Sequence, residues 1–80
     1  MPEALLDELD MVDKVTWVMK KRGLSYESII DDVNRNMPEG VTAVKTRQEI
    51  SRALNHGYSK GNRGRKNNAI INAVLKTLGI

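Results

Sequence analysis

The residues best suited to do chemistry in this chain of 80 amino acids form one short polar run, Thr46-Arg47-Gln48-Glu49. Thr46 and Glu49 have the spacing of a capping box, in which each side chain accepts a hydrogen bond from the other residue's backbone amide. The two residues between them then lie in the first turn of a helix, where arginine can pair with guanine and glutamine with adenine. The alternative is that these side chains only solvate the helix. Candidates for contact with base edges are Arg47, Gln48, Ser51 and Arg52.

A second candidate is the glycine- and cation-rich segment 59–66, which holds four cations and two glycines in eight residues. Cations release counterions when they bind a polyanion, and glycines allow the backbone to approach phosphates closely. Arg63-Gly64-Arg65 also resembles the core of AT-hook-like elements, which enter the narrow minor groove of A·T-rich DNA. We favour phosphate contact over minor-groove reading. Candidates for contact with the DNA backbone are Lys45, Lys60, Asn62, Arg63, Arg65 and Lys66.

Catalytic and metal chemistry find little support in the sequence. The one histidine, His56, follows a predicted helix end, where histidine most often caps the helix, and no serine has a plausible base partner. Asp31 and Asp32 are neighbours on a predicted helix and point to different sides, so they do not form an acid–base pair. The absence of cysteine excludes disulfides and thiolate metal sites. We expect a protein that is not an enzyme and needs neither cofactor, metal nor small-molecule substrate.

The charge is distributed unevenly along the chain. Residues 1–39 hold nine acids and five bases, a net charge of −4, whereas residues 40–80 hold eight bases and one acid, a net charge of +7. So strong a bias favours a polyanionic partner over a basic face that serves solubility alone. RNA is the less favoured polyanion, because only three aromatic residues are present on which bases could stack.

Helical periodicity predicts where these side chains are held. Apolar spacing predicts a first helix over 3–22 with Gly23 as its stop, although Asp10 and Asp13 could instead cap a second start and split it. Leu6 and Trp17 fall outside its apolar stripe. They are candidates for a contact with a second protomer or another protein, or else are incidentally exposed.

Three further helices are predicted. The second spans 25–37, with its first serine as a cap and Pro38 as its end. The third follows the capping box, and the last, 65–78, is closed by a glycine in a Schellman-type ending. Segment 41–45 either extends the third helix backward or is an extended connection. Since the chain has no Phe, we expect an aliphatic core within one all-α domain, residues 1–80, of four or five short helices.

Three stretches resemble helix-turn-helix proteins. Residues 24–30 read LSYESII and are similar to the LSxxxLA entry to the first helix of that motif. Residues 46–57 read TRQEISRALNHG and resemble the recognition helix of the lambda-repressor/Cro-like type, SxxxISRxxNG, and the VSRxLNG stretch of lactose-repressor-type headpieces. Residues 74–80 read VLKTLGI and are similar to the closing lAKALGI helix. The resemblance implies a helix-turn-helix core and gives Arg47, Gln48, Ser51 and Arg52 to the groove.

One departure concerns the turn. The family joins its two central helices by a few residues, and the stretch from Val33 to Thr46 is longer unless residues 41–45 are helical or the turn carries an insertion. The resemblance implies a small prophage- or plasmid-type transcriptional regulator that binds duplex DNA, with a homodimer as an expected assembly because such domains read paired half-sites.

The alternative is an adaptor or anti-regulator that binds protein through the acidic N-terminal half and Trp17. No apolar run approaches the roughly 20 residues that span a bilayer, and the N-terminus carries acids where a signal peptide would carry bases. We therefore expect a cytoplasmic protein without membrane contact.

Overall fold

The computed structural model describes residues 11–58 and 64–80, which contain helices and no strand. This confirms the all-α prediction. Four α-helices and one turn of 3-10 helix fall within the predicted count of four or five. In chain order they are α1 (Met11–Arg22), the 3-10 turn η2 (Glu27–Ile29), α2 (Ile30–Arg35), α3 (Arg47–His56) and α4 (Arg65–Leu78).

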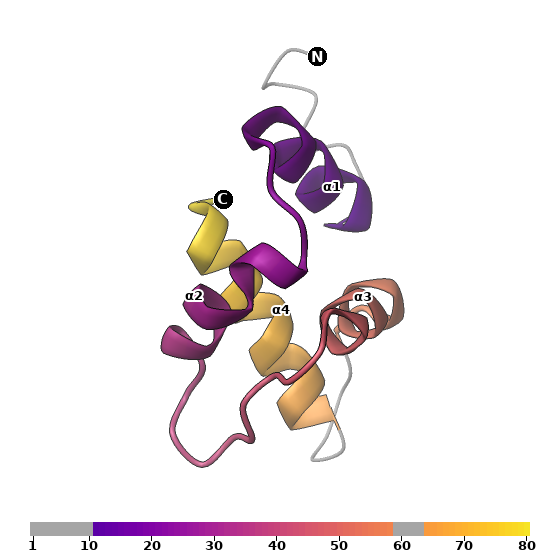
Figure 1. Cartoon of the computed structure of the whole chain (residues 1–80). Coiled ribbons are helices and arrows are strands. Elements are labelled where there is room, and N and C mark those ends of the chain that lie inside the picture. Colours follow the sequence, from indigo (N-terminus) through magenta and orange to yellow (C-terminus); the bar gives the residue numbers. More distant parts are fainter. Residues whose placement is uncertain (1–10, 59–63) are drawn as a thin grey trace.

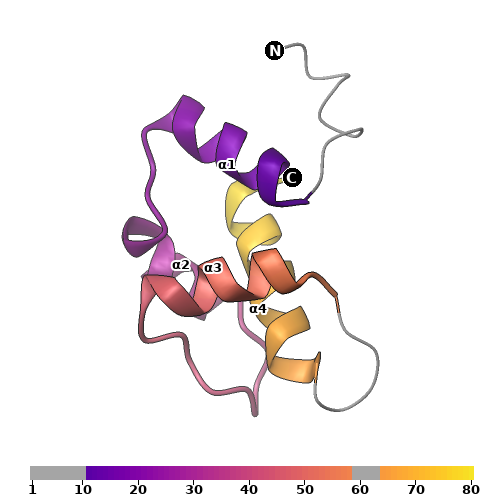
Figure 2. The same ribbon diagram turned by 90° about the vertical axis from the view of Figure 1, so that its right-hand side faces the viewer.

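Helix α4 is the centre of the packing, since α1, α2 and α3 all contact it (Figure 1). Figure 2 shows α3 lying across the outer side of α4. The buried core is aliphatic, as the lack of phenylalanine predicts, and the described residues bury no polar side chain. The largest fully buried side chains are those of Val15, Val33, Ile50, Leu54, Ile71, Val74 and Leu78.

Helix α1 covers the second part of the predicted helix 3–22, and residues 3–10 lie outside the described residues. It ends as predicted at Gly23, whose φ of 69° is left-handed. The Leu24 amide closes the helix end by donating to the Met19 carbonyl at 2.8 Å. Arg22, the last residue of α1, donates from Nη1 to the Leu78 carbonyl at 2.8 Å. This bond ties the end of α1 to the end of α4.

The predicted helix 25–37 is shorter and begins with a 3-10 turn. Ser25 and Ser28 cap each other: each hydroxyl accepts from the other residue's amide, at 3.2 and 2.9 Å. The α-helical part ends at Arg35, two residues before the predicted end at Met37. The Asn36 side-chain amide donates to the Asp32 carbonyl at 3.1 Å and to the Thr77 hydroxyl at 2.9 Å. These contacts turn the chain toward α4 before Pro38 is reached.

Residues 36–46 form a long non-helical connection, which decides between the two alternatives for segment 41–45. Val44 is buried, and both its backbone groups bond the Asn34 side chain: its amide donates at 2.7 Å and its carbonyl accepts at 2.9 Å. These bonds tie the segment to α2, and it does not join α3. Helices α2 and α3 are therefore joined by a longer connection than the tight turn of helix-turn-helix proteins.

Helix α4 has the predicted bounds and the predicted ending. Gly79 is left-handed with φ 72°, and the Ile80 amide donates to the Leu75 carbonyl at 3.0 Å. This is the bond pattern of a Schellman ending. None of the described helices combines the length and apolar character needed to cross a membrane.

Candidate nucleic-acid interface

The outer face of α3 carries the residues predicted to contact bases. Ile50, Ala53 and Leu54 are buried against the core, so the opposite face of the helix points to solvent. Of the four candidates, Ser51 is half-buried and the other three are exposed. At 100° per residue Gln48 and Arg52 both lie near the centre of this face, whereas Arg47 lies at its edge, on the side of the buried Leu54. The candidates are Arg47, Gln48, Ser51 and Arg52.

The capping box at the start of α3 is formed. One carboxylate oxygen of Glu49 accepts from the Thr46 amide at 3.0 Å and from the Lys45 amide at 2.6 Å. Its other oxygen lies 3.1 Å from the ammonium nitrogen of Lys66. The Lys45 and Thr46 amides, aided by the Lys66 ammonium, lower the pKa of Glu49 from 4.5 to about 2. The nearest acid is thus held by other donors and does not neutralise Arg47, as predicted.

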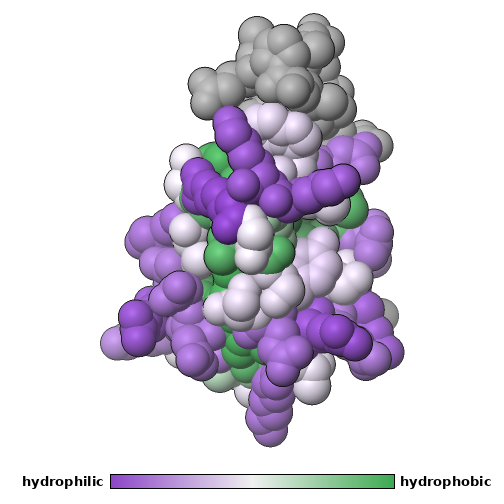
Figure 3. All heavy atoms as spheres, turned by 45° about the horizontal axis from the view of Figure 1, so that its top comes forward, coloured by the Kyte–Doolittle hydropathy of each residue, from purple (hydrophilic) through white to green (hydrophobic). Residues whose placement is uncertain are grey.

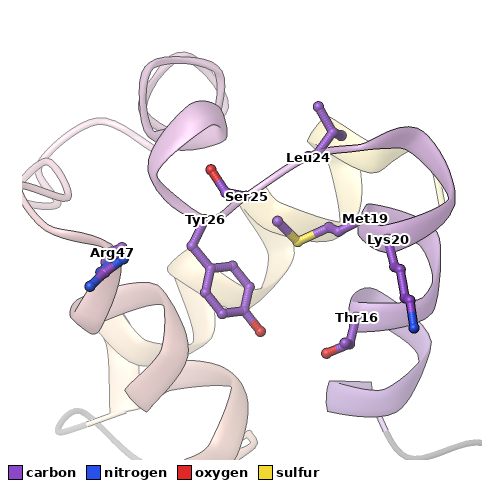
Figure 4. Close-up of a pocket in the computed structure, with 7 residues that line it drawn as sticks. All are labelled: Thr16, Met19, Lys20, Leu24, Ser25, Tyr26 and Arg47. Atoms are coloured by element: carbon purple, nitrogen blue, oxygen red, sulfur yellow. The ribbon is translucent and has the colours of Figure 1, made fainter.

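Arg47 borders a cleft between α3 and α1. The cleft has a volume of about 390 Å³ and is lined by Met19 and Lys20 from α1 and by Leu24 and Tyr26 from the segment that follows α1. Figure 4 shows the Tyr26 ring standing between the two helices, with Arg47 on one side. Within the described residues Arg47 forms no ion pair.

Arg52 borders a second cleft, between α3 and α4, of about 430 Å³. His56, one turn further along α3, and Lys66 and Asn67, from the first turn of α4, also line it. The Asn67 side chain donates to the Gly57 carbonyl at 2.5 Å, which fixes the start of α4 against the end of α3. Arg52, His56 and Lys66 thus line one cleft between the two helices, together with the Glu49 carboxylate.

Two polar residues of this surface were not predicted as nucleic-acid contacts. His56 was interpreted as a cap, although its spacing of four residues from Arg52 indicates a shared face. Asn55 is exposed, and its side chain donates to the Ser51 carbonyl at 2.9 Å and lies 3.4 Å from the Ser51 hydroxyl. Asparagine is a common partner of adenine, and the helical period of α3 places Asn55 on the same outer face as Gln48 and Arg52.

The residues predicted to contact phosphates are found in several settings. Lys45 and Arg65 are exposed, and Arg65 lies beside the Gly40 turn, its guanidinium 3.6 Å from where a Cβ on that glycine would be. Lys66 is half-buried and shares its charge with Glu49. The predictions for Lys60, Asn62 and Arg63 lie outside the described residues.

The predicted protein contact is also only partly described. Trp17 is half-buried and packs against the core. The Lys21 ammonium lies 4.9 Å from the centre of the ring. Leu6 lies outside the described residues. Within the described ranges, no group of three or more acidic or histidine side chains could hold a metal ion.

Comparison with known proteins adds no family. Neither a scan of family models nor searches of curated proteins and of solved structures found a match to this chain. The functional interpretation therefore depends on the geometry of α3 and its two edges.

Proposed function

We propose that this protein binds duplex DNA, as a small transcriptional regulator, through the outer face of α3. The observation that carries the proposal is that this face presents Arg47, Gln48 and Arg52 to solvent while its one acid, Glu49, is engaged with the Lys45 and Thr46 amides and with Lys66. Arginine and glutamine are side chains that read guanine and adenine in the major groove.

The start of α4 suits a contact with the DNA backbone beside that groove. The first turn of α4 contains no acid, and no side chain among the described residues is seen to cap it. The start of a helix attracts phosphate through its backbone amides and its dipole. Arg65 and Lys66 add positive charge at the same place. In this proposal the start of α4, together with Lys45, holds phosphates, and Lys60, Asn62 and Arg63 contribute from the neighbouring segment.

Because of the long connection 36–46, this proposal gives α2 a different role from the corresponding helix of helix-turn-helix proteins. In that family the helix before the recognition helix crosses the DNA backbone. Here α2 is held against α4 through Asn36 and Thr77, so the start of α4 takes over the contact with phosphates. A homodimer that reads two half-sites belongs to the proposal, since one short helix reads only a few base pairs.

The direct test is amide shift mapping of the whole chain with a short duplex, together with a salt titration of binding. We expect the largest shifts at Arg47, Gln48, Arg52 and Arg65, and an affinity that falls steeply with salt. Shifts that cluster on α1 or α2 would move the DNA surface elsewhere. No duplex affinity at low salt would overturn the proposal and favour the adaptor or anti-regulator.

A further inference from the structure

The cleft beside Arg47 combines an apolar floor with a basic rim. Met19, Leu24 and Tyr26 supply the apolar part, and Leu24 is one of the few large apolar side chains left exposed among the described residues. Figure 4 shows Met19 pointing into the cleft from α1 and the Tyr26 ring forming its opposite wall. In the space-filling view of Figure 3, apolar side chains reach the surface in several small areas between hydrophilic and intermediate ones.

The two cations of the rim come from different elements. Lys20 belongs to α1 and Arg47 to the first turn of α3, and they stand on opposite sides of the cleft (Figure 4). No acid lines the cleft. The nearest acid along the chain, Glu27, follows Tyr26 and begins the 3-10 turn. An occupant thus meets an apolar floor between two positive charges.

We propose that this cleft is the docking site for an acidic segment of a partner protein that carries a bulky apolar side chain between carboxylates. The apolar side chain covers Met19, Leu24 and Tyr26, and the carboxylates on either side pair with Lys20 and Arg47. Charge complementarity selects this occupant, because a basic or neutral apolar segment would leave both cations without partners. A nucleic acid could satisfy the cations and stack on the Tyr26 ring, but its polar backbone would leave Met19 and Leu24 without an apolar partner.

Docking and DNA binding share one side chain, and this consequence rests on the proposed function. Arg47 cannot pair with a carboxylate in the cleft and with a base edge at the same time. An acidic partner therefore competes with DNA for α3 and would act as a negative regulator. The docking itself does not depend on DNA binding, so the two are tested separately.

The first experiment titrates the full chain with the synthetic peptide Ac-Glu-Glu-Leu-Leu-Glu-Glu-NH2 and follows amide shifts. We expect shifts at Thr16, Met19, Leu24, Tyr26 and Arg47. A peptide with serines in place of the leucines, and one with lysines in place of the glutamates, should each bind at least about tenfold more weakly. Equal binding of all three peptides, shifts elsewhere, or no binding of the first peptide would overturn the proposal. A short single-stranded oligonucleotide that shifts the same residues more strongly would also overturn it.

Two variants locate the site. Leu24→Ser and Lys20→Glu change exposed side chains and should each weaken peptide binding about tenfold, with an unchanged unfolding midpoint. Lys76→Glu, an exposed charge on α4 outside the cleft, is the matched control and should bind like the parent. If all three variants bind equally, the peptide does not occupy this cleft.

The second experiment adds the peptide to the complex with duplex DNA. We expect release of DNA from the parent chain and none from Leu24→Ser at the same peptide concentration. Peptide binding without any DNA affinity would leave the docking site standing and would overturn the proposed function. DNA binding that the bound peptide does not weaken would overturn the competition.

Discussion

The two edges of α3 differ in how their charges are held. On the edge that faces α4, the Glu49 carboxylate holds two backbone amides and the Lys66 ammonium, and Arg52 lies beside it. On the edge that faces α1, Arg47 stands over an apolar cleft that no acid lines. One edge thus fixes where the helix starts, and the other leaves a cation accessible. In α3, the edge that faces α4 therefore stabilises the fold, and the edge that faces α1 is accessible to a ligand.

The largest expected effect is on DNA binding and concerns the edge of α3 that faces α1. Arg47→Ala should lose about 1–3 kcal/mol of binding on the preferred duplex and much less on random duplex, because a base contact is specific. The double change with Gln48→Ala should flatten discrimination and leave the fold intact, since both side chains are exposed. Both duplexes are compared at one salt concentration. Equal losses on both would make this helix a phosphate contact only, and no loss on either would refute the DNA reading of α3.

Changes on the edge of α3 that faces α4 should lower the unfolding free energy. Glu49→Gln removes the charge that holds the Lys45 and Thr46 amides and should cost about 1–2 kcal/mol of unfolding free energy. Lys66→Gln removes only the half-exposed ion pair and should cost at most about 1 kcal/mol. Urea denaturation of the two variants measures the difference. If Lys66→Gln costs as much as Glu49→Gln, the ion pair and not the capping box holds this edge.

The pH dependence of the unfolding free energy tests the contribution of Glu49 in a second way. The pKa of Glu49 is about 2 in the folded chain against an ordinary 4.5. Because the folded value is the lower one, its contribution to stability is complete above pH 4.5 and is lost as the pH falls toward 2. With solvent screening we expect a loss of about 1–2 kcal/mol. Urea midpoints between pH 5 and pH 2 should therefore fall more for the parent than for Glu49→Gln. Parallel curves would place the titration in another carboxylate.

The smallest effect is expected at the start of α4. Arg65→Ala should lower the salt slope of DNA binding by about 1, with little change in sequence preference, because a phosphate contact carries no base information. Lys76→Ala, at the far end of the same helix, is the control and should keep the parent slope. An altered preference for A·T-rich duplex in Arg65→Ala would support the minor-groove alternative for Arg63-Gly64-Arg65.

Features that depend on neighbours in the chain could be predicted from the sequence. The capping box, the left-handed Gly23 and Gly79, and the end of α4 follow from hydrogen bonds that span three to five residues. The aliphatic core follows from composition, and the outward face of α3 follows from the spacing of its apolar residues.

Features that depend on distant residues were decided by the tertiary structure. Segment 41–45 stays outside α3 because Asn34 on α2 bonds Val44, and α2 ends early because Asn36 reaches Thr77 on α4. Lys66 pairs with Glu49 because α4 packs beside α3. Arg47 borders an apolar cleft because α1 packs on the other side of α3. Residue types and the helical period determine which side chains share one face of a helix. What each of those side chains then meets depends on how the helices pack, which no local spacing encodes.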